Sequence, residues 1–393
     1  MTTRLPSKDL FLMMALWMEL YPRKPQISSS NVRNVGCVIV DRGKIVALGS
    51  TGEAHAVVRS ILGCSVETKG CDVFVSRFPC ALCVKLMVQA GIARIFYFPS
   101  SSWELGTATY SSRELILIPS LMDSPTRETM NGESSKQEAN FRAVSRLITN
   151  NAISLTLYIP KWSDSRFVYD KNVEHELFWE LDQSLRSMPN LLRHWDALQE
   201  SFAQTQYFVA KVIQEYVKPP KKGSSPISSD KPLLDFKIVQ HAMVMAHLIS
   251  KRTNDLKVGV GAVIIGIKQN YISVGWNSYP TKSSITDYPQ DGADNPGDDE
   301  ALKYSYILHA GSYFLRLEQN AFLWRMPHGT PLDECILVST KMPCDECSPV
   351  IYDCGIRTII TNKQIPKSLD DPSRLRGLTY EKISKLIPDI WIF

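Results

Sequence analysis

The sequence has no large excess of either charge and no long hydrophobic run. Lysine and arginine number 44 against 40 aspartate and glutamate, which gives a formal net charge of +4 over 393 residues. The basic residues form no long block of the kind that follows a phosphate backbone, so tight binding to polynucleotides is not indicated. No hydrophobic run approaches the ~20 residues of a membrane-spanning helix, so we expect no membrane partner.

The features of a secretory signal are also missing. The first apolar stretch, residues 10–20, directly follows Asp9 and is interrupted by Glu19, and no small-residue cleavage site comes after it. We therefore expect an amphipathic helix there. Without such a signal, the nine cysteines favour reduced, metal-binding thiolates over disulfides. We therefore expect a cytoplasmic protein. Residues 217–232 are basic and rich in Pro, Gly and Ser, which is typical of a linker, with a nuclear signal as the alternative.

Two parts of the chain resemble each other. Residues 35–50, VGCVIVDRGKIVALGS, match residues 260–276, VGAVIIGIKQNYISVGW, since each is an alternating strand that begins Val-Gly, a turn and a second strand. Residues 71–98 match residues 335–361, and in both a Pro-Cys-x-x-Cys motif precedes an apolar helix, Gly-Ile and another strand. The chain is therefore predicted to contain two copies of one domain.

Each copy has a histidine upstream of its Pro-Cys-x-x-Cys motif. The predicted ligand sets are His55, Cys80 and Cys83 in the first copy and His309, Cys344 and Cys347 in the second. One histidine and two cysteines leave the fourth position of tetrahedral zinc open, as a catalytic site needs. Cysteines at i and i+3 share one helical face, and a helix N-terminus favours thiolate. A lone C-x-x-C is also typical of a redox pair or of buried cysteines, but the duplicated set favours two Zn²⁺ per chain.

These motifs resemble those of the cytidine and deoxycytidylate deaminase family, whose signature is H-x-E followed by P-C-x-x-C. The resemblance implies an α/β fold of two tandem cytidine-deaminase-like domains, each a mixed five-stranded sheet flanked by helices, with zinc held between two helix N-termini. It also implies a small-molecule cytosine nucleotide as substrate and a homo-oligomer. We expect the first domain at residues 1–162, a helical connector and linker at 163–232, and the second domain at 233–393.

The reaction that this resemblance implies needs a glutamate as well as zinc. Zinc lowers the pKa of its bound water towards ~7, and the resulting hydroxide attacks C4 of cytosine. A glutamate two residues after the histidine carries protons from that water to N3 and to the leaving amine. In the first copy this position is Val57, and Glu53 lies on the wrong side of His55. The first copy is therefore either a structural zinc site or a regulatory pseudo-site.

The second copy carries more of the family's residues. Asn277, in SVGWNSYP, corresponds to the asparagine that contacts the sugar in deoxycytidylate-type deaminases, with a turn-forming asparagine as the alternative. Glu318, in EQNA, matches the end of the family's His-Ala-Glu-x-Asn-Ala string and is the candidate catalytic proton carrier, with an exposed helical glutamate as the alternative. We expect this copy to deaminate a cytidine or deoxycytidine nucleotide such as dCTP or dCMP. The alternative is a catalytically dead zinc-binding scaffold.

Seven additional residues, 311–317, divide this motif and put His309 and Glu318 nine positions apart instead of two. Seven residues make two helical turns to within ~20°, so one continuous helix places Glu318 on the proper side but ~10.5 Å too far along. If EQNA is aligned with the motif instead, Arg316 takes the ligand position, and a guanidinium cannot bind zinc. Deamination therefore requires the insert to loop out, and a splice or gene-model artefact is an equal alternative to a real insertion.

Overall fold

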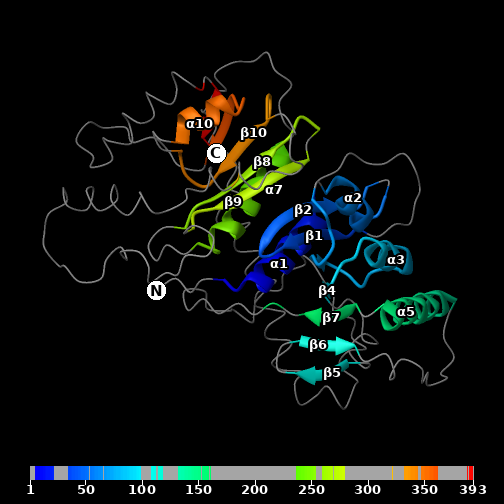
Figure 1. Cartoon of the computed structure of the whole chain (residues 1–393). Coiled ribbons are helices and arrows are strands. Elements are labelled where there is room, and N and C mark those ends of the chain that lie inside the picture. The colour runs from blue at the N-terminus through cyan, green and yellow to red at the C-terminus, as the bar shows by residue number, and fades with distance from the viewer. Residues whose placement is uncertain are drawn as a thin grey trace, which may run out of the picture. The chain divides into compact units, whose positions relative to one another are not determined.

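The computed structural model describes residues 5–21, 34–52, 54–64, 66–98, 108–111, 114–117, 132–151, 153–158, 160, 236–253, 259–268, 270–278, 321, 332–343, 347–361, 387 and 389–392. They belong to two compact units, an N-terminal unit, Pro6–Lys211, and a C-terminal unit, Val212–Phe393 with Met1–Leu5 (Figure 1). The predicted domain limits and the helical connector lie outside the described residues and stay predictions. Among the helices that are described, none has the length and apolar character that a membrane crossing requires.

The N-terminal unit is built on a mixed seven-stranded sheet. Its helices are α1 (Ser7–Glu19), α2 (Ala56–Gly63), α3 (Ala81–Gln89) and α5 (Gly132–Asn151), and its strands are β1 (Gly36–Asp41), β2 (Lys44–Ser50), β3 (Asp72–Val75), β4 (Arg94–Tyr97), β5 (Ala108–Ser111), β6 (Glu114–Leu117) and β7 (Ser154–Tyr158). The strand order is β2-β1-β3-β4-β7-β6-β5. The strands β3, β4 and β7 run parallel, and the remaining pairs are antiparallel.

The C-terminal unit is built on a mixed five-stranded sheet. Its described helices are α7 (Phe236–Ser250) and α10 (Cys347–Asp353), and its strands are β8 (Gly261–Ile265), β9 (Tyr271–Trp276), β10 (Ile336–Ser339), β11 (Thr358–Thr361) and β12 (Asp389–Ile392). The strand order is β12-β11-β10-β8-β9, with β10, β11 and β12 parallel and the other pairs antiparallel.

The two sheets share one plan. The order β2-β1-β3-β4-β7 has the same directions as β9-β8-β10-β11-β12, and the register of the first hairpin shifts once in each unit, just before its turn. The predicted α/β fold class is therefore confirmed. The N-terminal sheet nevertheless has two strands more than predicted, because the hairpin β5–β6 pairs with the edge of β7.

The first helix forms where the sequence predicts it, but it is not amphipathic. Ten consecutive residues of α1, from Asp9 to Met18, are buried. A helix that is apolar on nearly all sides belongs in a core rather than at a surface. The prediction of a helix is therefore confirmed, and the prediction that it is amphipathic is wrong.

Helix and strand approach each other closely at one equivalent glycine in each unit. A methyl group added to Gly36 of β1 would overlap the carbonyl oxygen of Ala15 in α1, and one added to Gly261 of β8 would overlap that of Ala246 in α7. Only glycine allows two backbones to lie so close together. The Val-Gly that begins each strand pair in the sequence therefore marks where a helix lies against the central strand.

Gly36→Ala is expected to lower the free energy of unfolding by ~1–3 kcal/mol, the usual effect of overpacking, because α1 must move to admit the methyl group. The matched control is Gly63→Ala at the end of α2, where an added methyl group meets nothing within 4 Å. Urea unfolding followed by far-UV circular dichroism measures both variants. A Gly36→Ala protein as stable as the wild type would contradict the close packing of α1 on β1.

Candidate metal centre

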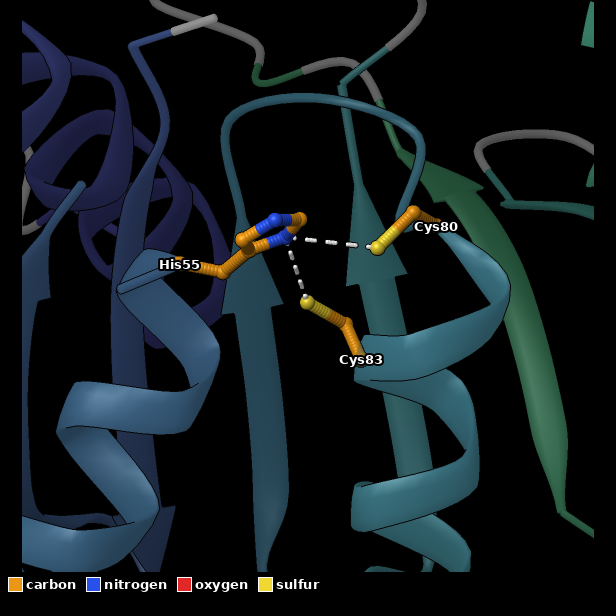
Figure 2. A group of neighbouring side chains, drawn as sticks. All are labelled: His55, Cys80 and Cys83. Atoms are coloured by element: carbon orange, nitrogen blue, oxygen red, sulfur yellow. Dashed lines mark hydrogen bonds between the residues drawn. The ribbon is translucent and has the colours of Figure 1, made fainter. Parts of the chain in front are cut away.

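Two helix N-termini bring three predicted ligands together in the N-terminal unit. His55 is the N-cap residue of α2, and Cys80 is the N-cap residue of α3, with Cys83 in the first turn of the same helix. Helix α3 follows the carboxyl end of β3, and α2 and α3 are in contact. Figure 2 shows the imidazole lying between the two helices and facing both sulfur atoms. The structure thus assembles the first predicted ligand set from residues that are up to 28 positions apart.

The spacing of the three donor atoms fits zinc. Nδ1 of His55 lies 3.3 Å from Sγ of Cys80 and 3.4 Å from Sγ of Cys83, and all three donor atoms lie within 4.8 Å of one another. In a tetrahedral site with usual Zn–N and Zn–S bond lengths, nitrogen and sulfur ligands are roughly 3.5 Å apart. Two thiolates and an imidazole are also the ligand types that zinc prefers. The donor set therefore matches a zinc ion in both chemistry and size.

The two cysteines differ in their affinity for a proton. Hydrogen bonds from the thiol and the backbone N–H of Cys83, with the nearby imidazole of His55, lower the pKa of Cys80 to about 5. The hydrogen bond to Cys80, together with burial, raises the pKa of Cys83. The environment therefore favours the thiolate form at Cys80 and the thiol form at Cys83. A metal that takes both sulfurs as ligands must displace the proton of Cys83.

The loop that leads into α3 is fixed by an ion pair with α1. Nε and Nη2 of Arg77 donate hydrogen bonds to the carboxylate of Glu19, the last residue of α1, and the shortest of these is 2.7 Å. The side chains are only 24% and 10% exposed, and a two-point contact of this kind sets direction as well as distance. The residues just before Cys80 are thus held against the first helix of the unit.

The N-terminal site has no proton carrier in the position that deamination requires. Val57, two residues after His55, has an apolar side chain that is only 2% exposed. Valine has no group that can take up or release a proton. Glu53 lies outside the described residues. The described part of this site therefore can bind a metal but contains no acid or base beside its ligands.

In the C-terminal unit, one predicted ligand lies among the described residues. Cys347 is the first residue of α10, the next helix after β10, and its side chain is fully buried. Its place corresponds to that of Cys83 in the first turn of α3, the helix that follows β3. It belongs to a core cluster that also contains Ala262, Ile264 and Ala321. His309, Cys344 and Glu318 lie outside the described residues, so their roles as ligands and as proton carrier stay predictions.

The last residue of EQNA has a defined position. Ala321 is fully buried, and its carbonyl oxygen accepts a hydrogen bond of 2.6 Å from Oγ of Ser273 in β9. In the N-terminal unit, the equivalent strand β2 carries α2, and a methyl group added to its Gly49 would meet Ser60 of that helix. Ser273 is the equivalent of Ala47, because Ser273 pairs with Ile264 as Ala47 pairs with Ile39. Ala47 and Gly49 are two positions apart and therefore lie on one face of β2, so both contacts lie on the same face of equivalent strands. Ala321, the last residue of EQNA, therefore lies against the face of β9 that corresponds to the face of β2 covered by α2.

Asn277 ties together the ends of two strands. Its Oδ1 accepts a hydrogen bond of 2.8 Å from the N–H of Val260, its own N–H donates to the carbonyl oxygen of Val260, and it is 7% exposed. Thr51 makes the same pair of contacts with Val35 in the N-terminal unit. The structure thus gives Asn277 a structural role in joining the two strand ends. Its predicted contact with a sugar stays a prediction.

Known proteins resemble the chain in the same two regions. A family model described as the cytidine and deoxycytidylate deaminase zinc-binding region matches residues 14–99 and 237–363, together more than half of the chain. The chain is 27% identical over 433 residues to cytidine and dCMP deaminase domain-containing protein 1 of Danio rerio, covering 98% of this chain and 88% of that protein.

Shorter matches cover smaller shares of the chain. Deoxycytidylate deaminase of Homo sapiens is 27% identical over 161 residues, covering 38% of this chain and 84% of that enzyme. Among solved structures, dCMP deaminase from the cyanophage S-TIM5 in complex with dCMP and dUMP is 21% identical, covers 41% of this chain and all of that chain, and has a TM-score of 0.31. Since the family model takes in the His55, Cys80 and Cys83 cluster in one region and Cys347 in the other, the chain belongs to the cytidine and deoxycytidylate deaminase family, whose chemistry is zinc-type deamination.

Proposed function

We propose that this protein is a zinc-dependent deaminase of a cytidine or deoxycytidine nucleotide, with its catalytic residues in the C-terminal unit and one zinc ion in each unit. The observation that carries the proposal is the His55, Cys80 and Cys83 cluster, whose donor atoms have the spacing of a zinc site. The shared strand plan and the position of Cys347 at the start of α10 support a second site of the same kind.

The two units have different tasks in this proposal. The N-terminal unit binds zinc without turning over a substrate, because a buried valine stands where the proton carrier is required. The C-terminal unit has Glu318 as its candidate proton carrier and Asn277 at the end of β9 as its candidate sugar contact. Catalysis is therefore assigned to the C-terminal unit.

The reaction is hydrolytic, so water adds at C4 of the cytosine ring and ammonia leaves, giving the uracil form. His309, Cys344 and Cys347 would hold the zinc ion, which when bound supplies a Lewis acid that makes water nucleophilic at neutral pH. Glu318 would take a proton from the attacking water and deliver it to N3, and would then carry the proton of the new C4 hydroxyl to the amine, which leaves as ammonia while the C4 carbonyl forms. Asn277 would orient the nucleotide through its sugar.

The relatives support a nucleotide as substrate. The human relative is named deoxycytidylate deaminase, and the zebrafish relative is named for cytidine and dCMP deaminase domains. Both dCMP and dCTP are substrates to test. A homo-oligomer remains part of the proposal, as it does for the family in general.

The insert at residues 311–317 opposes activity. If EQNA is aligned with the family's motif, Ala321 corresponds to Ser60, which is five residues after His55 in the sequence. Counting five residues back from Ala321 gives Arg316, whose guanidinium cannot bind zinc. On this alignment His309 does not occupy the ligand position unless the insert loops out.

Purified protein is expected to contain close to two zinc ions per chain, and Cys80→Ser is expected to remove one of them, because serine is a poor zinc ligand. Inductively coupled plasma mass spectrometry measures the ratio. Cys64→Ser is the matched control, since Cys64 is partly buried in the same unit and lies outside the cluster. One ion in the wild type that Cys80→Ser leaves in place would refute the N-terminal metal site.

Deletion of residues 311–317 restores His-Ala-Glu and is expected to raise deamination from an absent or very low rate to a readily measured one. The assay follows uracil products from cytidine, dCMP and dCTP for the deletion variant and the wild type at matched zinc content. Equal rates would show that the insert loops out harmlessly. No activity in either protein would favour the alternative function, a catalytically dead scaffold that binds zinc.

In whichever of these two proteins is active, Glu318→Gln is expected to abolish turnover while zinc stays bound. Glutamine keeps the size of the side chain but cannot carry a proton, so only the chemical step is affected, by roughly 10²–10⁴-fold. Metal content and product formation are measured on the same sample. Full activity in the glutamine variant would remove Glu318 from the mechanism.

A further inference from the structure

The N–H of Ala81, the first residue of α3, needs an acceptor from outside its own helix. The first backbone N–H groups of a helix have no partner within the helix, and Ser, Thr, Asp or Asn at the N-cap position usually accepts from one of them. In α3 the N-cap residue is Cys80, whose sulfur faces His55 and Cys83. That sulfur accepts from the N–H of Cys83, and an N-cap side chain does not serve the N–H of the first helical residue, so the N–H of Ala81 still needs a partner.

A distant residue supplies the missing acceptor. Oδ1 of Asn140 accepts a hydrogen bond of 2.8 Å from the N–H of Ala81, the first residue of α3, across 59 positions of sequence. That N–H belongs to the peptide group that joins Cys80 to Ala81. Asn140 therefore acts on the backbone directly beside one ligand and within three residues of the other.

The helix that carries Asn140 is anchored beside the metal centre. Phe141, Val144 and Ile148 form a buried stripe along α5, at the spacing of one helical face, and α5 is in contact with α3. The ring of Phe141 lies 5.5 Å from that of Phe78, two residues before Cys80, and Phe78 packs edge-on against Tyr97 at 5.2 Å. Asn140 is thus held in place by packing rather than left on a free surface.

We propose that Asn140 is a positioning residue for the metal centre of the N-terminal unit. By holding the peptide group between Cys80 and Ala81, it fixes the first turn of α3 so that both sulfurs face His55. It lies outside residues 14–99, the part of the N-terminal unit that the family model matches. The inference rests on the proposed zinc site and adds to it the part of the unit that keeps the site in shape.

Asn140→Ala is expected to weaken zinc binding by roughly 10–100-fold, the usual effect of removing a partner that orients a metal ligand. Asn140→Asp keeps an oxygen acceptor and adds negative charge at a helix N-terminus, so it is expected to retain the affinity of the wild type. Asn151→Ala is the matched control, because Asn151 lies on the same helix, is exposed and bonds only locally to the carbonyl oxygen of Leu147 in the contacts that the structure describes.

The experiment uses the full chain. Zinc affinity is measured by competition with a chromophoric chelator, and the signal that Cys80→Ser removes defines the N-terminal site. The same proteins are loaded with Co²⁺, whose visible spectrum reports the ligand geometry. The expected result is weaker binding and an altered spectrum for Asn140→Ala, and wild-type values for Asn140→Asp and Asn151→Ala.

Three results would overturn the inference while leaving the zinc site intact: unchanged affinity and spectrum in Asn140→Ala, no recovery in Asn140→Asp, or an equal loss in Asn151→Ala. If Cys80→Ser removes no metal signal, the metal site itself fails and the inference fails with it. Should Asn140→Ala not fold, Asn140→Leu replaces it, because leucine has nearly the size of asparagine but offers no acceptor.

Discussion

The whole N-terminal site depends on two helices that begin at the same place. His55 ends the segment before α2, and Cys80 ends the loop that follows β3, so the start of each helix decides where a ligand lies. Helix N-termini carry partial positive charge and free N–H groups, which favour a thiolate over a thiol. The lowered pKa of Cys80 agrees with such a setting, although hydrogen bonds from Cys83 contribute most to it. The packing of α2 and α3 on the sheet therefore sets both the geometry and the charge of the site.

The same dependence explains why an insertion in the C-terminal unit is so consequential. A ligand at the start of a helix and a proton carrier two residues later keep their distance and direction only if no further residues are inserted between them. Ser273 donates a hydrogen bond to the carbonyl oxygen of Ala321, so the end of the motif is tied to β9. In the proposed site, seven more residues would then have to be taken up between Ala321 and the predicted ligand His309. A helix absorbs them by displacing the ligand by two turns, and a loop absorbs them only by exposing or newly covering apolar side chains.

The sequence predicted those parts of the fold that have a local pattern. The strands after Val35 and Val260, and the apolar helices after both Pro-Cys-x-x-Cys motifs, are where the sequence predicts them. The first strand of each pair is nevertheless buried along nearly its whole length and not at alternate residues, as the sequence analysis had expected. The hairpin β5–β6 was missed, because two four-residue strands are short for any periodic signal. The ligands His55, Cys80 and Cys83 were found because each copy repeats them. Asn140 and Thr51 were not, since a hydrogen bond across 59 or 16 positions leaves no trace in local sequence.

Ligand geometry and proton transfer place separate demands on this fold, which is why one unit can have the first without the second. Three ligands are fixed by where two helices begin, and that arrangement needs nothing from the side chain at position 57. A glutamate at a site that is only 2% exposed would have its carboxylate removed from water, which is costly without a partner. Valine at the same site contributes roughly 1.5–3 kcal/mol by burial instead. A unit that needs only to hold its metal is therefore more stable with valine, and glutamate is expected only where proton transfer is required.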